Sequence, residues 1–264
     1  MNRIKQLYSM FKEFAEKKNL ESKGITEEEF SEVFEMKHCP MNENVRSFNQ
    51  SVPLEQYKKK LSVIRDVVHF LYDVIFDVML IERDVNTVDT PKRLAKLMVP
   101  DLNNHNELLS GRWCEKPSLT SFEYDEDTDD VKTVTTGSDV IVKVKINLYS
   151  LCSHHMLPFG TFNSKPSVYV MYVANKIYPG LSKIGRLVNY IARRGWMQEK
   201  LAETIAETIK KEFKLKGVFV LLDNIVHSCS IHRGYADDTE MSTMYYNGIF
   251  KTDEKLLQTA KTLL

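Results

Sequence analysis

The chain has 264 residues, 43% of them hydrophobic, so its length permits a sizeable buried core. Its 36 basic and 36 acidic residues give a formal net charge of zero, which argues against a general nucleic-acid binder. The N-terminus lacks the features of a secretory signal, and the most apolar run, 69–81, is too short to span a bilayer. The four cysteines do not suggest a disulfide framework. We therefore expect a cytoplasmic protein that binds neither membranes nor nucleic acid.

Residues 1–52 are interpreted as an accessory helical segment that ends in a linker. Apolar residues recur at helical spacing from Ile4 to Ala15 and predict an amphipathic helix. Thr26 and Glu29 form a capping-box pattern before a second, shorter helix. The polar and irregular stretch 42–53 is typical of a linker.

Residues 53–113 are interpreted as a helical region that packs on the core. The longest helical stripe of the chain runs from Ile64 to Val78 and predicts a long helix. Thr90 and Pro91 are typical of an N-cap and a first helical turn, so we expect a short helix that ends near Met98. Residues 101–113 are predicted to be a loop.

Residues 114–264 are predicted to form the catalytic domain. Alternation of apolar and polar residues predicts strands at 142–148 and 168–172, which pair as an antiparallel hairpin. Helical spacing follows at 184–191 and 197–213, the second helix being closed by a glycine, and apolar runs predict two further strands at 218–222 and 244–246. The predicted order is strand, strand, helix, helix, strand, strand. This order indicates an α+β fold preceded by an N-terminal helical region.

Two short motifs, Cys152-Ser153-His154-His155 and His227-Ser228-Cys229, together offer two thiolates and an imidazole. This ligand set can hold zinc while one coordination position stays open for water. An open position is typical of catalytic zinc sites, so the two motifs indicate an enzyme. Spacing alone does not decide whether His154 or His155 is the ligand.

His154 and His227 stand beside the proposed ligands and are candidates for general acid and base, because histidine titrates near neutral pH. Either could instead be a hydrogen-bond partner of a ligand, or the ligand itself in place of His155. A strand that continues regularly past His227 would put Cys229 and Arg233 on the same face as this histidine.

Three polar residues, Ser182, Lys183 and Arg186, lie at the start of the helix that follows Pro179-Gly180. A helix N-terminus with two cations is a favourable anion site, and Arg233 would extend it to suit a polyphosphate. The alternative is that Ser182 only caps the helix while the cations are solvated.

Gln198 and Glu199 open the next helix, where the helix dipole favours a carboxylate without any further role. The functional alternative is that a buried Glu accepts hydrogen bonds from the adjacent donors on the Watson–Crick edge of guanine, which adenine lacks. A base-reading pair, an anion site and an open zinc site together indicate a purine nucleotide substrate.

Five motifs occur in order along the chain: Asp89-Thr90-Pro91-Lys92-Arg93, Leu148-Tyr149-Ser150-Leu151-Cys152-Ser153-His154-His155, Gly180-Leu181-Ser182-Lys183-Ile184-Gly185-Arg186, Met197-Gln198-Glu199-Lys200-Leu201 and His227-Ser228-Cys229-Ser230-Ile231-His232-Arg233-Gly234. With these motifs the chain strongly resembles type I GTP cyclohydrolase over roughly residues 89–250. The resemblance implies the tunnelling fold, in which ββααββ units with two long helices on one face of an antiparallel sheet assemble into a ring. It also implies a homodecamer of two stacked pentamers, with active sites between subunits.

The resemblance further implies the conversion of GTP and water to 7,8-dihydroneopterin triphosphate and formate, a first step of pterin, folate or deazaguanine synthesis. It assigns each candidate residue one role, as follows: zinc ligands Cys152, His155 and Cys229; proton transfer His154 and His227; triphosphate binding Ser182, Lys183, Arg186 and Arg233; guanine binding Gln198 and Glu199; and Arg93 reaching the phosphates from a neighbouring subunit.

Ser153 departs from the family pattern, because it stands where the family usually carries Glu. Loss of a carboxylate beside the metal could alter the protonation of His154 or of the zinc-bound water. Two alternatives follow from this departure. The same fold could act on another purine nucleotide, or the protein could be a non-catalytic nucleotide-binding oligomer.

Overall fold

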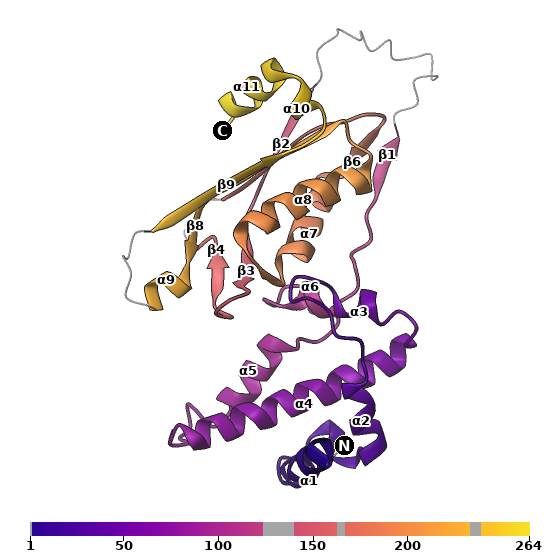
Figure 1. The fold of residues 1–264 in the computed structure, drawn as a ribbon, viewed down its shortest axis with the longest axis vertical. Helices are drawn as coiled ribbons and strands as arrows, with labels where there is room; N and C mark the ends of the chain where they lie inside the picture. Colours follow the sequence, from indigo (N-terminus) through magenta and orange to yellow (C-terminus); the bar gives the residue numbers. More distant parts are fainter. Residues whose placement is uncertain (1, 124–139, 163–166, 233–238) are drawn as a thin grey trace. The chain divides into compact units, whose positions relative to one another are not determined.

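The computed structural model describes residues 2–123, 140–162, 167–232 and 239–264. The chain forms two compact units, Met1–Glu115 and Lys116–Leu264, and each has a hydrophobic core of its own. Figure 1 shows the elements of both units in chain order, from indigo to yellow. Within the described ranges, no helix combines the length and the apolar character that crossing a membrane requires.

The first unit is helical, and α1, α2 and α4 share one apolar cluster that includes Phe11, Phe30 and Phe70. The predicted capping box is confirmed, because the Glu29 amide donates to the Thr26 hydroxyl and the Thr26 amide donates to the Glu29 carboxylate. The helices of this unit are α1 (Asn2–Lys17), the 3-10 helix η1 (Glu21–Gly24), α2 (Glu27–Phe34), α3 (Val45–Phe48), α4 (Leu54–Val78), α5 (Thr90–Met98) and α6 (Ser110–Trp113).

The stretch interpreted as a linker, 42–53, is more ordered than its polar composition suggested. It contains α3, and its Asn44 and Asn49 side chains are buried. The Asn44 side-chain amide donates to the backbone carbonyls of Gly111 and Cys114, at 2.8 and 2.7 Å. The polar composition of this stretch therefore reflects side chains that bind buried backbone carbonyls. It does not indicate a solvated linker.

The second unit has the predicted α+β composition. Its strands are β1 (Ser121–Glu123), β2 (Ile141–Ile146), β3 (Tyr149–Cys152), β4 (Pro158–Gly160), β5 (Val168–Val173), β6 (Ile177–Pro179), β7 (Gly195–Trp196), β8 (Gly217–His227) and β9 (Glu240–Tyr246). Its helices are α7 (Leu181–Ala192), α8 (Gln198–Phe213), α9 (Ser228–His232), α10 (Ile249–Thr252) and α11 (Glu254–Thr262).

The four longest strands, β2, β5, β8 and β9, pair antiparallel with one another. The predicted antiparallel pairing is confirmed for 142–146 with 168–172, whereas Asn147 and Leu148 lie outside β2. The short strands β3 and β4 lie between β2 and β5 in the sequence. The expected closure of α8 by Gly217 is wrong. Lys214 ends this helix in a left-handed conformation with φ of 50°, and Gly217 already belongs to β8.

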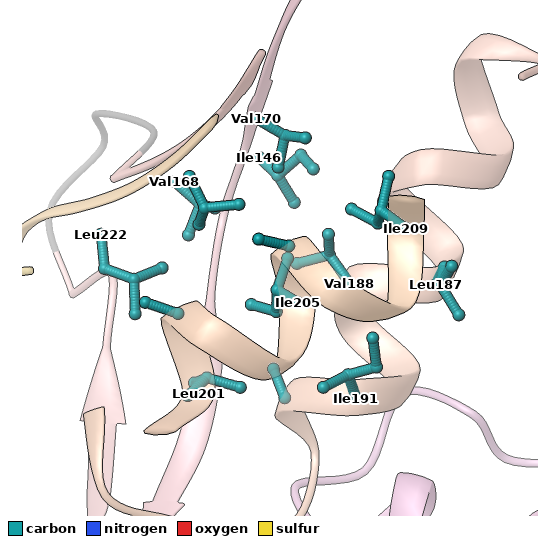
Figure 2. Packing of buried hydrophobic residues seen from close by; sticks show 14 of the residues in the cluster. Ile146, Val168, Val170, Leu187, Val188, Ile191, Leu201, Ile205, Ile209 and Leu222 are labelled. Atoms are coloured by element: carbon teal, nitrogen blue, oxygen red, sulfur yellow. The ribbon is translucent and has the colours of Figure 1, made fainter. Parts of the chain in front are cut away.

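Helices α7 and α8 pack their apolar faces against one face of the sheet. Figure 2 shows Ile205 and Ile209 of α8 and Val188 of α7 directed towards side chains of β2 and β5 such as Ile146 and Val170. This packing explains the helical spacing found in the sequence, since a helix buries only the stripe that faces its neighbour. Between the two helices, β7 pairs with the end of β3, so that Trp196 lies opposite Cys152.

Ile205→Ala is expected to reduce the free energy of unfolding by about 2–5 kcal/mol, because it leaves a cavity among fully buried side chains. Lys211→Ala, at an exposed position of the same helix, should change it by less than about 0.5 kcal/mol. Chemical denaturation of the two variants beside the wild type measures the difference. Equal unfolding midpoints for both variants would contradict this packing.

Candidate metal centre

A tight turn after β3 brings His155 back towards Cys152. The Cys152 amide donates to the Leu157 carbonyl at 2.8 Å, and the Met156 amide donates to the Cys152 carbonyl at 2.9 Å. Met156 closes this turn with a left-handed φ of 53°. The chain then forms β4, which pairs with both β3 and the end of β8.

The chain turns directly after His227, where β8 ends and α9 begins. The Ser228 hydroxyl donates to the Pro158 carbonyl, and the Ser230 hydroxyl donates to the His227 carbonyl at 2.7 Å. The strand therefore does not continue through Cys229, as a shared face with His227 would have required, because these bonds favour a helical turn. Arg233, predicted for the same face, lies outside the described residues.

The two turns bring together Cys152, His155 and Cys229, whose ligand atoms all lie within 4.8 Å of one another. Cys152 Sγ and His155 Nδ1 are 3.7 Å apart. Among the described residues, no other group of three or more His, Cys, Asp or Glu side chains is arranged so that it could hold a metal ion. Both adjacent histidines are exposed, and the structure brings His155, not His154, into the group.

This donor set suits zinc. Burial, and then the neighbouring Cys152 thiol, raise the pKa of the Cys229 thiol. Two thiolates this close repel each other, and a divalent cation between them would remove that repulsion. Sulfur and imidazole nitrogen are the ligands that zinc prefers, and three protein ligands are the number found in catalytic zinc sites.

His227 lies in a fixed orientation beside this group. Its ring stacks on Phe159, with centroids 4.5 Å apart and planes inclined by 8°. Its Nε2 is 2.7 Å from the side-chain oxygen of Gln198. Burial lowers the pKa of His227, and the Glu199 carboxylate opposes part of that shift. The ring is therefore favoured in its neutral form near pH 7.

The two residues predicted to bind guanine differ in exposure. Gln198 is only 2% exposed, and its amide nitrogen donates to the Met241 carbonyl and the Thr243 hydroxyl, both at 3.0 Å. Glu199 is exposed, although the sequence argument assumed a buried carboxylate. Phe159, Met241 and Thr243 were not found from the sequence, because none of them belongs to a recognisable motif.

The predicted anion site lies at the far end of α7 from the metal group. Ser182 and Lys183 are in the first turn of α7. The N-cap residue is Gly180, so Ser182 does not cap this helix. The other end of this 12-residue helix leads into β7, where Trp196 pairs with Cys152. A helix of that length is about 18 Å long, so the fold separates the two predicted parts of the site within one chain.

Arg186 is exposed one turn further along α7. Arg93 lies in the helical first unit, on α5. Neither residue belongs to the group of Cys152, His155 and Cys229.

Comparison with known proteins gives matches over the second unit and the end of the first. The model of the family GTP cyclohydrolase I matches residues 78–264. The GTP cyclohydrolase 1 of Rickettsia prowazekii (strain Madrid E) is 32% identical over 170 residues, which are 63% of this chain and 83% of the relative. The GTP cyclohydrolase 1 of Saccharolobus islandicus (strain L.S.2.15 / Lassen #1) is 35% identical over 170 residues, which are 64% of this chain and 74% of the relative.

Among solved structures, the apo form of the archaeosine synthase QueF-Like matches 42% of this chain and 96% of its own, with a TM-score of 0.32 and 18% identity. A similarity this low adds nothing to the fold described above. The family match, in contrast, covers well over half of the chain and includes every residue of the metal group. The chain therefore belongs to the GTP cyclohydrolase I family, and it is a hydrolase.

Proposed function

We propose that this protein is a zinc-dependent GTP cyclohydrolase that converts GTP and water to 7,8-dihydroneopterin triphosphate and formate. The observation that carries the proposal is the convergence of Cys152, His155 and Cys229 in a chain of this family. These three residues would hold the ion, which when bound supplies a Lewis acid that activates water near neutral pH.

His154 and His227 are proposed to move protons between the substrate and solvent. The burial that lowers the pKa of His227 keeps its imidazole neutral, so it can accept a proton before it donates one. His154 is exposed and directly precedes His155, and it can therefore exchange protons with solvent. One partly buried and one exposed histidine are suited to a reaction that both opens and closes rings.

The triphosphate is proposed to bind Ser182, Lys183 and Arg186 at the N-terminus of α7, where the helix dipole favours an anion. Arg233 would contribute from the same chain as the metal ligands, and Arg93 from a neighbouring subunit. Because α7 begins far from the metal group, the copy of α7 that completes each site would come from another subunit.

We therefore propose the tunnelling fold and a homodecamer of two stacked pentamers. Two features support this assembly. The second unit has the order ββααββ in its main elements, and among its described strands β2 and β9 each have a hydrogen-bonded partner on one side only. Open strand edges of this kind can pair with neighbouring copies and close a ring.

The reaction is proposed to begin pterin, folate or deazaguanine synthesis in the cytoplasm. All four cysteines are free thiols. A site that needs two thiolates for metal binding favours a reducing compartment, which supports the proposed location.

A GTP turnover assay on protein of known zinc content tests the function. Formate and the pterin product should appear together, disappear when a chelator removes zinc, and return when zinc is restored. GTP, dGTP and ATP should be compared, because Ser153 stands where the family usually carries Glu. Faster turnover of dGTP or ATP than of GTP would contradict the proposed substrate. Zinc-loaded protein that releases no formate from any of them would contradict the proposed activity.

Glu199→Gln is expected to lower kcat/KM for GTP about 10- to 100-fold, the loss expected for one hydrogen bond to a charged group. The new side-chain NH2 would face the N–H donors of guanine and repel them. Glu203→Gln is the matched control, because Glu203 lies one turn later on α8 and accepts from Lys200 at 2.8 Å. Steady-state kinetics check both variants. Equal kcat/KM values for the two would refute the proposed contact between Glu199 and guanine.

A further inference from the structure

The buried side-chain amide of Gln198 has both of its ends engaged within the chain. Its nitrogen donates to two groups of β9, the Met241 carbonyl and the Thr243 hydroxyl, both at 3.0 Å. Its oxygen lies 2.7 Å from His227 Nε2. At 2% exposure, the amide is largely withdrawn from any ligand in the site.

These contacts fix which end of the amide faces His227. A backbone carbonyl can only accept hydrogen bonds, so the Met241 carbonyl must receive its bond from the NH2 group of Gln198. A flipped amide would put two oxygens against each other and leave the NH2 group against the ring. The hydrogen-bond network therefore assigns the orientation of the amide, as such networks do for Asn and Gln.

The orientation of the amide in turn fixes the tautomer of His227. The Gln198 oxygen is only an acceptor, so His227 Nε2 must carry the proton of their hydrogen bond. In a neutral imidazole the other nitrogen, Nδ1, is then without a proton. The parallel stack on Phe159, which pairs with His227 in the register of β4 and β8, holds the plane of the ring.

We propose that Gln198 is a positioning residue that fixes the tautomer and orientation of His227, so that Nδ1 of His227 is the nitrogen left for the substrate. This inference deepens the proposed function and rests on it for the role of His227. It gives Gln198 a role different from that of its neighbour, because the exposed Glu199 is free to meet the base whereas the amide of Gln198 acts through the histidine.

Solid-state NMR of the sedimented, zinc-loaded protein with 15N-labelled histidine tests the tautomer without turnover. The signals of His227 are assigned as those that disappear from the spectrum of the His227→Asn variant. In the wild type, Nε2 should carry the proton and Nδ1 should not. The opposite tautomer in the wild type overturns the proposal, and this test does not depend on how any Gln198 variant folds.

Gln198→Met keeps the length of the side chain and removes its hydrogen bonds, so His227 should populate both tautomers. The matched control is Gln258→Met on α11, where the exposed Gln258 amide donates to Glu254. This control should leave the signals of His227 unchanged. A single unchanged tautomer in folded Gln198→Met overturns the proposal.

Kinetics separate a positioning role from contact with the base. Gln198→Met should lower kcat about 10- to 100-fold, within the contribution of one positioned proton-transfer group, while KM for GTP stays near the wild-type value. An increase in KM at unchanged kcat would mean that Gln198 binds guanine, and would overturn the proposal. A wild type that does not turn over GTP sinks the proposed function, while the NMR result on the tautomer stands by itself.

Discussion

Cys229→Ala is expected to release zinc and to lower GTP turnover at least about 10³-fold. Cys229 is one of three side chains in the metal group, and the two ligands that remain are too few for a catalytic zinc site. Activation of water by the ion contributes several kcal/mol to lowering the barrier, which corresponds to the expected loss in rate. Zinc per chain and kcat, measured on the same preparation, check this result.

Cys39→Ala is the matched control for this variant. Cys39 is a free, partly buried thiol in the other unit, and it is outside the metal group. Its removal should leave both zinc content and turnover at wild-type levels. A Cys229→Ala protein that retains one zinc per chain and normal kcat would contradict the assigned ligand set. Thermal unfolding of both variants shows whether a loss of zinc reflects a loss of fold.

The order of helices and strands in the second unit could be predicted because each element buries one face. The stripe from Leu201 to Phe213 and the alternation from Val142 to Ile146 are direct consequences of packing on a shared core. A group of metal-binding side chains could also be expected, because two cysteines and a histidine in short motifs near strand ends are the donor set of a catalytic zinc site. The structure brings these three side chains together.

The local geometry of the site could not be predicted, because contacts between distant residues determine it. Spacing left His154 and His155 open, although the resemblance implied His155. The position of His155 in the group depends on a left-handed Met156 in a turn between two paired strands. The end of β8 depends on a bond from Ser228 to the Pro158 carbonyl, 70 residues earlier. Sequence periodicity describes only one element at a time. It predicted a strand at 218–222 and did not show where β8 ends.

Gln198 illustrates the same limit for function. Its motif suggested contact with guanine, whereas its burial and its two donor contacts come from β9, more than 40 residues later. Glu199, the next residue, is exposed. Two neighbours in one motif can therefore have separate roles that only the tertiary fold distinguishes.

Mixed oligomers are expected to recover activity that neither parent variant has. Cys229→Ala removes the metal end of the site, and the double variant Lys183→Ala/Arg186→Ala removes the proposed triphosphate end. Each lost charge-assisted hydrogen bond costs about 1.5–3 kcal/mol, so the double variant alone should lose about 10²- to 10⁴-fold in kcat/KM. If each site takes its metal end and its α7 from different chains, co-assembly of the two variants recreates intact sites.

When equal amounts of the two chains assemble at random, about a quarter of the sites should combine two intact parts. Co-expression with two different affinity tags, followed by purification through both, isolates the mixed oligomers. Formate release per zinc bound then measures the recovered sites, and the two homo-oligomers mixed after assembly are the control. Mixed oligomers that stay inactive would mean that one chain supplies both ends of the site. That result would contradict the proposal that α7 of another subunit completes each site. The proposal follows from the length of α7, whose first turn lies about 18 Å along the helix from the end that leads to Cys152.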